Sequence, residues 1–129
     1  MKIFGFGTDL VNIKRIKKVM SNNKSFKNRI YSSLEIKMCE KRKDKYNCYA
    51  KRFAAKEAFS KALGTGISQE VEFKNIVVNN DKNGKPFIKL KGKTLNKTKK
   101  IIKNKNFNIL LTLTDEKPFA AATVILIKQ

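Results

Sequence analysis

The spacing of apolar residues divides the chain into a mainly helical first half and a second half richer in strands. Residues 3–8 read as a short strand, after which apolar side chains recur at helical intervals over residues 10–20. Residues 107–114 alternate with a period of two, and residues 119–127 are apolar on both faces, which predicts a central strand. The helical stripe over residues 10–20 comprises Leu10, Ile13, Ile16, Val19 and Met20.

Capping signals mark the start of one short helix. Ser32 and Glu35 match the capping-box pattern, in which a hydroxyl is followed three residues later by Glu. We therefore expect a helix to begin there and to direct Leu34, Met38 and Cys39 inward.

The longest predicted helix begins near Tyr46 and ends before Gly64, which can adopt the left-handed conformation of a C-cap. Its many Ala residues keep it thin, so other backbone can approach it closely. Two strands joined by a turn at Asn83-Gly84 follow, and residues 92–105 predict a lysine-rich helix. The predicted order is βααα, ββ, α, ββ, which describes a single α+β domain over residues 1–129.

The chain is strongly basic, with 30 Lys and Arg against 10 Asp and Glu and a formal net charge of +20. Such a charge favours acidic partners, including phosphorylated ligands, nucleic acids and acidic proteins. Few of the basic residues are Arg and Asn is abundant, as in AT-rich genomes, so much of this charge is expected to solvate the surface. An RNA- or ribosome-binding protein is an alternative, but the aromatic-plus-basic strands of such proteins are missing, and we expect no nucleic-acid partner.

The rare residue types narrow the chemistry further. The chain has no His, which excludes histidine-based catalysis. Cys39 and Cys48 lack metal-ligand spacing, and we predict that both are reduced thiols in a cytosol-like compartment. The longest apolar run, at residues 119–127, is too short to span a bilayer, so we expect no membrane partner.

Two acidic residues occupy informative positions in this basic chain. Asp9 ends the first predicted strand, and Glu57 lies in the Ala-rich helix between Phe53 and Phe59. A carboxylate in apolar surroundings costs free energy unless it is paired. Lys61, one turn after Glu57, offers a salt bridge, and Asp9 offers an N-cap for the next helix. A shared Mg²⁺ site completed by substrate phosphates is the third interpretation, and the two residues alone do not decide among them.

Five segments resemble, in order and spacing, the holo-[acyl-carrier-protein] synthases, the small type of 4'-phosphopantetheinyl transferase. The segments are GFGTD at 5–9, FKNRI at 26–30, RFAAKEAFSKALGTG at 52–66, NGKP at 83–86 and AAATV at 120–124. The resemblance implies an antiparallel-rich sheet wrapped around a long central helix. It also implies transfer of 4'-phosphopantetheine from coenzyme A to a serine of an acyl carrier protein. The other product is adenosine 3',5'-bisphosphate, and the reaction supports fatty acid biosynthesis.

The resemblance also implies residue roles. It assigns Asp9 and Glu57 to Mg²⁺, with Mn²⁺ as an alternative, and makes Glu57 the candidate base, directly or through a metal-bound water. Lys61 would help to neutralise the diphosphate leaving group. Contacts to coenzyme A are implied for Arg52, Lys56, Lys61, Gly84, Lys85, Pro86, Thr112 and Thr114.

The implied partners are an acidic carrier protein and further copies of this chain. The carrier would dock on the first helix, and the active sites of a homotrimer would lie between subunits. The implied location is the cytoplasm of a bacterium, or a plastid-type organelle if the chain is the mature part of a targeted protein. The docking residues implied are Lys14, Arg15, Lys24 and Phe26.

Asp115 departs from the family pattern, because relatives place a histidine near the nucleotide at this position. A carboxylate there would repel phosphate and weaken the affinity for coenzyme A unless it points away or is neutralised by Lys117. A protein that binds carrier but transfers nothing is therefore a further interpretation.

Overall fold

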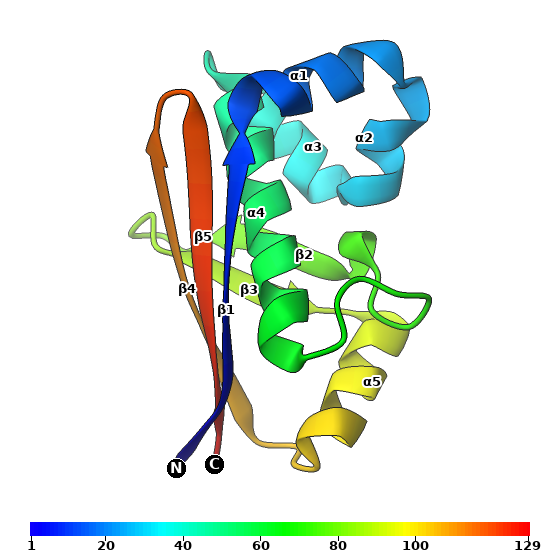
Figure 1. Cartoon of the computed structure of the whole chain (residues 1–129), viewed down its shortest axis with the longest axis vertical. Coiled ribbons are helices and arrows are strands. Elements are labelled where there is room, and N and C mark those ends of the chain that lie inside the picture. Colours follow the sequence, from blue (N-terminus) through cyan, green and yellow to red (C-terminus); the bar gives the residue numbers. More distant parts are fainter.

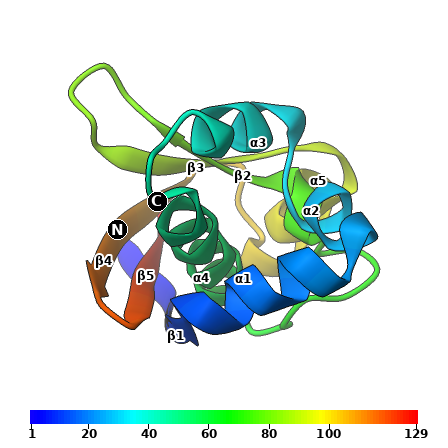
Figure 2. The ribbon, with the colours of Figure 1, turned by 90° about the horizontal axis from the view of Figure 1, so that it is seen from above.

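A computed structural model describes all 129 residues, and the helix α4 (Lys45–Leu63) forms its centre. Figure 1 shows α4 lying against strands β1, β5 and β4, and Figure 2 shows the other elements grouped around it. The predicted order βααα, ββ, α, ββ is confirmed except for one additional helix, α2, in a segment where no helix was predicted. The remaining elements are β1 (Lys2–Asn12), α1 (Ile13–Asn22), α2 (Lys24–Ile30), α3 (Ser33–Glu40), β2 (Ile76–Asn80), β3 (Pro86–Leu90), α5 (Gly92–Ile102), β4 (Phe107–Glu116) and β5 (Phe119–Lys128), with a 3₁₀ turn at Phe73–Asn75.

The strands form two separate antiparallel sheets on different sides of α4. The larger sheet has the order β1-β5-β4, so β5 is central, as its apolar character on both faces predicts. The smaller sheet is the hairpin β2-β3. The predicted α+β class with antiparallel sheet around a long helix is confirmed.

Strand β1 and helix α4 touch at backbone distance. A Cβ atom added to Gly5 would overlap the carbonyl oxygen of Ala62, and one added to Gly7 would overlap that of Ala58. The two glycines and the two alanines therefore remove the side chains that would keep strand and helix apart. This close approach brings the C-terminal half of β1 beside the middle of α4.

Strand β1 is longer than predicted. It pairs with β5 as far as Asn12, and Asp9 lies within the strand, opposite Ala122. The predicted N-cap role of Asp9 is therefore wrong, because the side chain of Asn12 caps α1 by accepting a hydrogen bond from the Lys14 amide at 2.9 Å. Leu10 does not join the buried stripe of α1, since pairing with β5 leaves it 65% exposed.

The capping box at the start of α3 is confirmed. The Glu35 amide donates to the Ser32 hydroxyl, and the Ser32 amide donates to the Glu35 carboxylate at 2.9 Å. The predicted inner face is partly wrong: Leu34 is exposed and Met38 half-buried, whereas Glu35 and Cys39 are buried. The helix turns its carboxylate inward because a buried lysine pairs with it there.

The prediction of two reduced cysteines is also wrong in this structure. Cys39 at the end of α3 and Cys48 in the first turn of α4 form a disulfide, with their Cα atoms 5.5 Å apart. The short connection between α3 and α4 turns the chain back and brings the two residues together.

The last helix, α5, ends at Ile102, three residues earlier than predicted. Lys103 takes a left-handed conformation with φ 60°, which terminates the helix. No helix in the structure has the length and apolar character that a membrane span requires.

Candidate active site

A cavity of about 340 Å³ lies between β1, α1, α2 and α4. Asp9, Arg15 and Glu57 line it, and the rest of its wall is apolar and includes Phe26 and Phe53. The glycine–alanine contact between β1 and α4 places the first carboxylate beside the second. The structure therefore brings together the two acids that the sequence singles out.

Asp9 is paired with Lys61, one turn after Glu57 on α4. The Lys61 ammonium lies 2.9 Å from the Asp9 carboxylate and also donates to the Thr8 carbonyl at 3.1 Å. The alternative of a Glu57–Lys61 salt bridge is therefore wrong, because the lysine reaches across to β1 instead. The Lys61 side chain remains 52% exposed, so its ammonium group is open to a ligand that binds beside Asp9.

Glu57 is half-buried and forms none of the ion pairs found in the structure. Burial raises the pKa of its carboxyl group, and the negative charge of Asp9 raises it further, while Lys61 opposes both effects. Two neighbouring carboxylates, only one of which is paired with a cation, are a donor set that a divalent ion neutralises. The residues present thus fit a Mg²⁺ or Mn²⁺ ion.

The candidate metal site holds only two protein carboxylates, because no group of three His, Cys, Asp or Glu side chains converges in the structure. Mg²⁺ keeps several waters and often takes its other ligands from substrate phosphates. The small number of protein ligands therefore suits a phosphate-bearing substrate better than a closed structural site.

Lys56, the neighbour of Glu57, points the opposite way into the interior. Its ammonium is fully buried and donates to Glu35 at 2.8 Å and to the carbonyls of Phe73 and Ile76 at 2.8 and 2.6 Å. Burial lowers the pKa of Lys56 to about 8, against the opposing effect of Glu35. The predicted contact of Lys56 with nucleotide phosphates is wrong for this fold, since all three ammonium hydrogens are used inside the protein.

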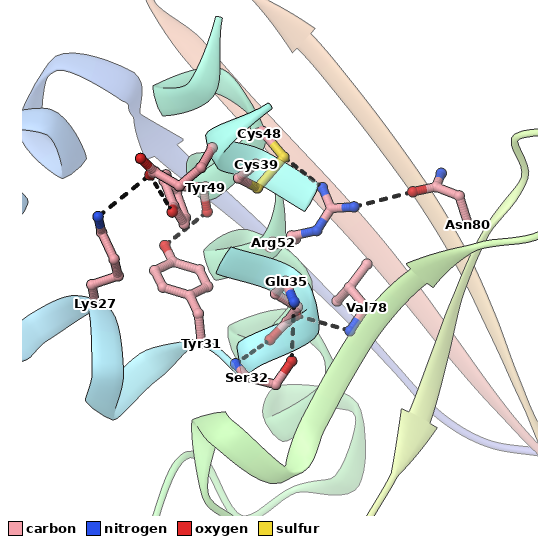
Figure 3. Close-up of a disulfide and its surroundings, with 11 residues drawn as sticks. Lys27, Tyr31, Ser32, Glu35, Cys39, Cys48, Tyr49, Arg52, Val78 and Asn80 are labelled. Carbon is pink, nitrogen blue, oxygen red and sulfur yellow. Dashed lines mark hydrogen bonds and ion pairs between the residues drawn. A yellow bond between two sulfur atoms is a disulfide. The ribbon is translucent and has the colours of Figure 1, made fainter. Parts of the chain in front are cut away.

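Arg52 is also enclosed, with only 2% of its surface exposed. Figure 3 shows its guanidinium between the disulfide and Asn80, to which it donates at 3.1 Å. Burial lowers the pKa of Arg52, with Glu35 acting in the opposite direction. The prediction that Arg52 reaches the nucleotide phosphates is therefore not met in the folded chain.

Glu35 is the residue of this region that the sequence interpretation missed. Its carboxylate accepts from Lys56 and Ser32 through one oxygen and from the Val78 amide at 2.9 Å through the other. Figure 3 shows the bonds to Ser32 and Val78. The capping box signalled its position at the helix start. No local pattern indicated that the same side chain would bind α4 and β2 at once.

The other residues implied for coenzyme A lie away from the Asp9–Glu57 cavity. Lys85 and Pro86 line a cavity of about 440 Å³ beside β4, and Gly84 occupies the hairpin tip with φ 86°. Thr112 and Thr114 lie on the exposed side of β4, and Thr114 lines a third cavity near the β4-β5 turn. A single chain thus spreads the predicted contacts over several surfaces.

The predicted docking residues are partly brought to the cavity. Arg15 and Phe26 line it, whereas Lys14 and Lys24 are exposed on the neighbouring helices. Phe26 is largely buried and stacks on Phe53 with ring centroids 6.2 Å apart, so little of its ring is open to a partner.

Asp115 is bound to the first half of α4. Its carboxylate accepts a hydrogen bond from Asn47 at 2.9 Å and pairs with Lys51 at 3.3 Å. The bond from Asn47, followed by the charge of Lys51, lowers the pKa of Asp115 against the effect of burial. Lys117 pairs with Asp44 at 3.7 Å rather than with Asp115, so the neutralising cation is Lys51.

Comparison with known proteins gives matches over nearly the whole chain. Residues 5–124 match the profile of the 4'-phosphopantetheinyl transferase superfamily. A "Holo-[acyl-carrier-protein] synthase" of Pelagibacter ubique is 46% identical over 129 residues, covering 100% of both chains. The crystal structure of a holo-[acyl-carrier-protein] synthase from Neisseria meningitidis superposes with a TM-score of 0.87 at 36% identity, covering 98% of this chain and 100% of that one. A Bacillus anthracis synthase in complex with CoA (3',5'-ADP) superposes with a TM-score of 0.80 at 34% identity, covering 98% of each chain.

Proposed function

Because the chain belongs to the 4'-phosphopantetheinyl transferase superfamily, we propose that it is a holo-[acyl-carrier-protein] synthase. It transfers 4'-phosphopantetheine from coenzyme A to a serine hydroxyl of an apo acyl carrier protein. The serine oxygen forms a new bond to the phosphorus next to pantetheine, and the diphosphate bond to adenosine 3',5'-bisphosphate breaks. The serine proton passes to a base. The transfer supports fatty acid biosynthesis.

One observation carries this proposal: Asp9 and Glu57 line one cavity together with Arg15, and Lys61 pairs with Asp9. Asp9 and Glu57 would hold Mg²⁺ or Mn²⁺, and the bound cation would supply positive charge beside the diphosphate of coenzyme A, where negative charge develops on the departing bisphosphate. Lys61 is held by Asp9 and is exposed, so its ammonium group adds a second positive charge beside the diphosphate. Glu57, with its raised pKa, is suited to receive the serine proton, directly or through a water.

The donor binds along the surfaces that carry Lys85, Pro86 and the threonines of β4. These surfaces lie apart from the acids within one chain, so the proposed site is completed by a second copy. The acidic carrier docks on α1 and α2, where Lys14, Arg15 and Lys24 present positive charge.

The outer face of the larger sheet supports a homotrimer. The register aligns Phe6, Ile125 and Leu110 across the three strands on this face, where Phe6 is 74% and Leu110 46% exposed. Exposed apolar patches on single chains commonly mark protein interfaces. Two rows further along the same face Leu10 and Thr114 flank Ala121, so packing between copies would bury the face beside the predicted donor contacts.

The proposed reaction belongs in the cytoplasm of a bacterium, the kind of organism from which the three relatives named above come, or in a plastid-type organelle for the mature part of a targeted protein. Both compartments would supply the donor and an acidic carrier protein.

The decisive experiment incubates the protein with coenzyme A, Mg²⁺ and an apo carrier protein and follows the mass of the carrier. We expect the mass to rise by one phosphopantetheine group, and the rise to disappear with EDTA or with a carrier whose acceptor Ser is replaced by Ala. Carrier binding without any mass change would reject the transferase in favour of a binding protein.

A further inference from the structure

The guanidinium of Arg52 links the core of the protein to a surface loop. Its Nη1 donates to the Cys48 sulfur of the disulfide and its Nη2 to the side-chain oxygen of Asn80, both at 3.1 Å (Figure 3). Arg52 lies on α4, and Asn80 is the last residue of β2. The arginine therefore bridges the disulfide-linked helices and the end of the hairpin strand.

Asn80 also binds the loop between β2 and β3, residues 81–85. Its side-chain amide donates to the Gly84 carbonyl at 2.9 Å. The other hydrogen bonds of the loop are internal, including those from the Asn83 and Lys85 amides to the Asp81 carboxylate. Asn80 thus holds the loop with one end of its side chain and the arginine with the other.

The buried charges around Arg52 explain why its contact with Asn80 matters. Arg52 and Lys56 are two buried cations, and Glu35 is the only buried carboxylate. Both oxygens of Glu35 are occupied by Lys56, Ser32 and Val78. The Arg52 Nε has no hydrogen-bond partner, so Asn80 supplies the only oxygen that the guanidinium binds.

We propose that Arg52 is a positioning residue that, through Asn80, fixes the loop of residues 81–85 and thereby sets the affinity for the donor coenzyme A. The inference rests on the proposed function, in which this loop borders the nucleotide. A planar guanidinium can donate to the sulfur and to Asn80 at the same time, whereas a lysine presents a single point of charge. Arg52 acts here without touching the donor.

The sharpest variant is Asn80→Asp, which keeps an oxygen for Arg52 and removes the donor to Gly84. It places a carboxylate against the guanidinium, so the chain is expected to fold. Asn79→Asp is the matched control, because it adds the same charge one residue away, and Asn79 gives the loop no side-chain donor. Arg52→Lys and the double variant with Asn80→Asp complete the set.

The first readout is hydrogen–deuterium exchange of the loop peptide in the full chain, and the second is coenzyme A affinity by calorimetry. In Asn80→Asp and Arg52→Lys we expect faster loop exchange and donor binding weakened about three- to tenfold, the loss of one hydrogen bond. The carrier KM should stay constant. The double variant should bind coenzyme A no more weakly than the weaker-binding of the two single variants, because both changes interrupt the same chain of contacts from Arg52 through Asn80 to Gly84.

Unchanged loop exchange in Asn80→Asp would overturn the inference. So would equal weakening of coenzyme A binding in Asn79→Asp, which would identify added charge as the cause. Additive losses in the double variant would show that Arg52 acts on the donor by another route. Lys85→Ala separates the two proposals: if it leaves coenzyme A affinity unchanged, the donor site assigned to this loop fails, whereas loop exchange still tests the positioning by Arg52.

Discussion

Two neighbouring residues of α4, Lys56 and Glu57, show how one helix can hold both a buried ion pair and an open candidate active site. Lys56 is buried, and protein acceptors satisfy its whole ammonium group. Glu57 faces a cavity and shares it with a second carboxylate, Asp9. Consecutive residues of a helix point in different directions, so a single step along α4 changes the surroundings completely.

The difference lies in how far each charge is compensated. The interior pair is closed, because Glu35 and two carbonyls use every donor of Lys56. In the cavity Lys61 binds Asp9 and leaves Glu57 without an ion-pair partner. The first arrangement leaves no donor open to a ligand, and the second retains a charge that a metal ion or a substrate proton can use.

The largest effect is expected on stability when the interior pair is broken. Lys56→Met leaves the Glu35 carboxylate buried without its cation, and we expect a loss of about 3–5 kcal/mol in the free energy of unfolding. Lys61→Met, which removes the exposed partner of Asp9, should cost at most about 1 kcal/mol. Urea unfolding of both variants measures the comparison, and equal losses would contradict it.

The opposite result is expected for activity. Glu57→Gln keeps the shape of the side chain but removes the charge proposed to bind the metal, so transfer should fall at least 100-fold, about 3 kcal/mol of transition-state stabilisation. The free energy of unfolding should not decrease, because one of two repelling carboxylates becomes neutral. Single-turnover assays at saturating Mg²⁺ measure the loss, with the exposed Glu70→Gln as control. Full activity in Glu57→Gln would remove the metal-site argument.

The acid pair also predicts a dependence on pH. Burial and the charge of Asp9 raise the pKa of Glu57, so metal binding should weaken as pH falls through this raised value. Between the unfolded and folded pKa values the folded chain binds more protons, so the contribution of Glu57 to stability decreases as pH rises through that interval. Asp9→Asn should lower the pKa of Glu57, which ¹³C NMR of the side chain can follow. A pKa unmoved by Asp9→Asn would mean that the two carboxylates do not interact.

Local signals predicted much of the fold. The capping box, the left-handed Gly64 and the two-sided apolar run of β5 each depend on neighbouring residues, and each is confirmed. The prediction that Leu10 belongs to the buried stripe of a helix was wrong. Leu10 pairs with β5, a strand more than 100 residues away, and this pairing extends β1 beyond the residue at which the helical pattern begins.

For the same reason, the sequence predicted that the two acids of the candidate site lie together but did not predict the positions of Arg52 and Lys56. The sequence places Arg52, Lys56 and Glu57 on one helix but does not say which elements cover each side of it. Only the packed structure shows Glu35 and β2 enclosing the two cations, and β1 leaving Glu57 at a cavity. Likewise, the spacing of Cys39 and Cys48 could not show that the turn between α3 and α4 brings them together.

A smaller effect is expected at Arg15, which we call the rim of the cavity that contains Asp9 and Glu57. Arg15 is exposed on α1 and lines the same cavity as the acids, so Arg15→Glu should raise the carrier KM about fivefold to tenfold and leave coenzyme A affinity nearly constant. Added salt should weaken carrier binding to the unmodified protein, because exposed complementary charges are screened. Lys18→Glu, an equal charge change on the same helix outside the cavity, is the control. A selective loss of coenzyme A affinity would assign this rim to the donor instead.

The smallest effect is expected at Asp115. Its carboxylate is partly exposed, like those of Asp9 and Glu57, but it is paired with a lysine, as the buried Glu35 is. Its carboxylate is held by Asn47 and Lys51, which turns it toward α4. Asp115→Asn and Asp115→His should therefore change coenzyme A affinity by less than about twofold, or about 0.4 kcal/mol. Because its folded pKa is lowered, Asp115 stabilises the fold above the unfolded pKa, and this small contribution is lost as pH falls through the lowered value. Calorimetry with coenzyme A decides the matter: a clear tightening in Asp115→Asn would show that the carboxylate faces phosphate in the working protein, and that pairing with α4 does not shield it.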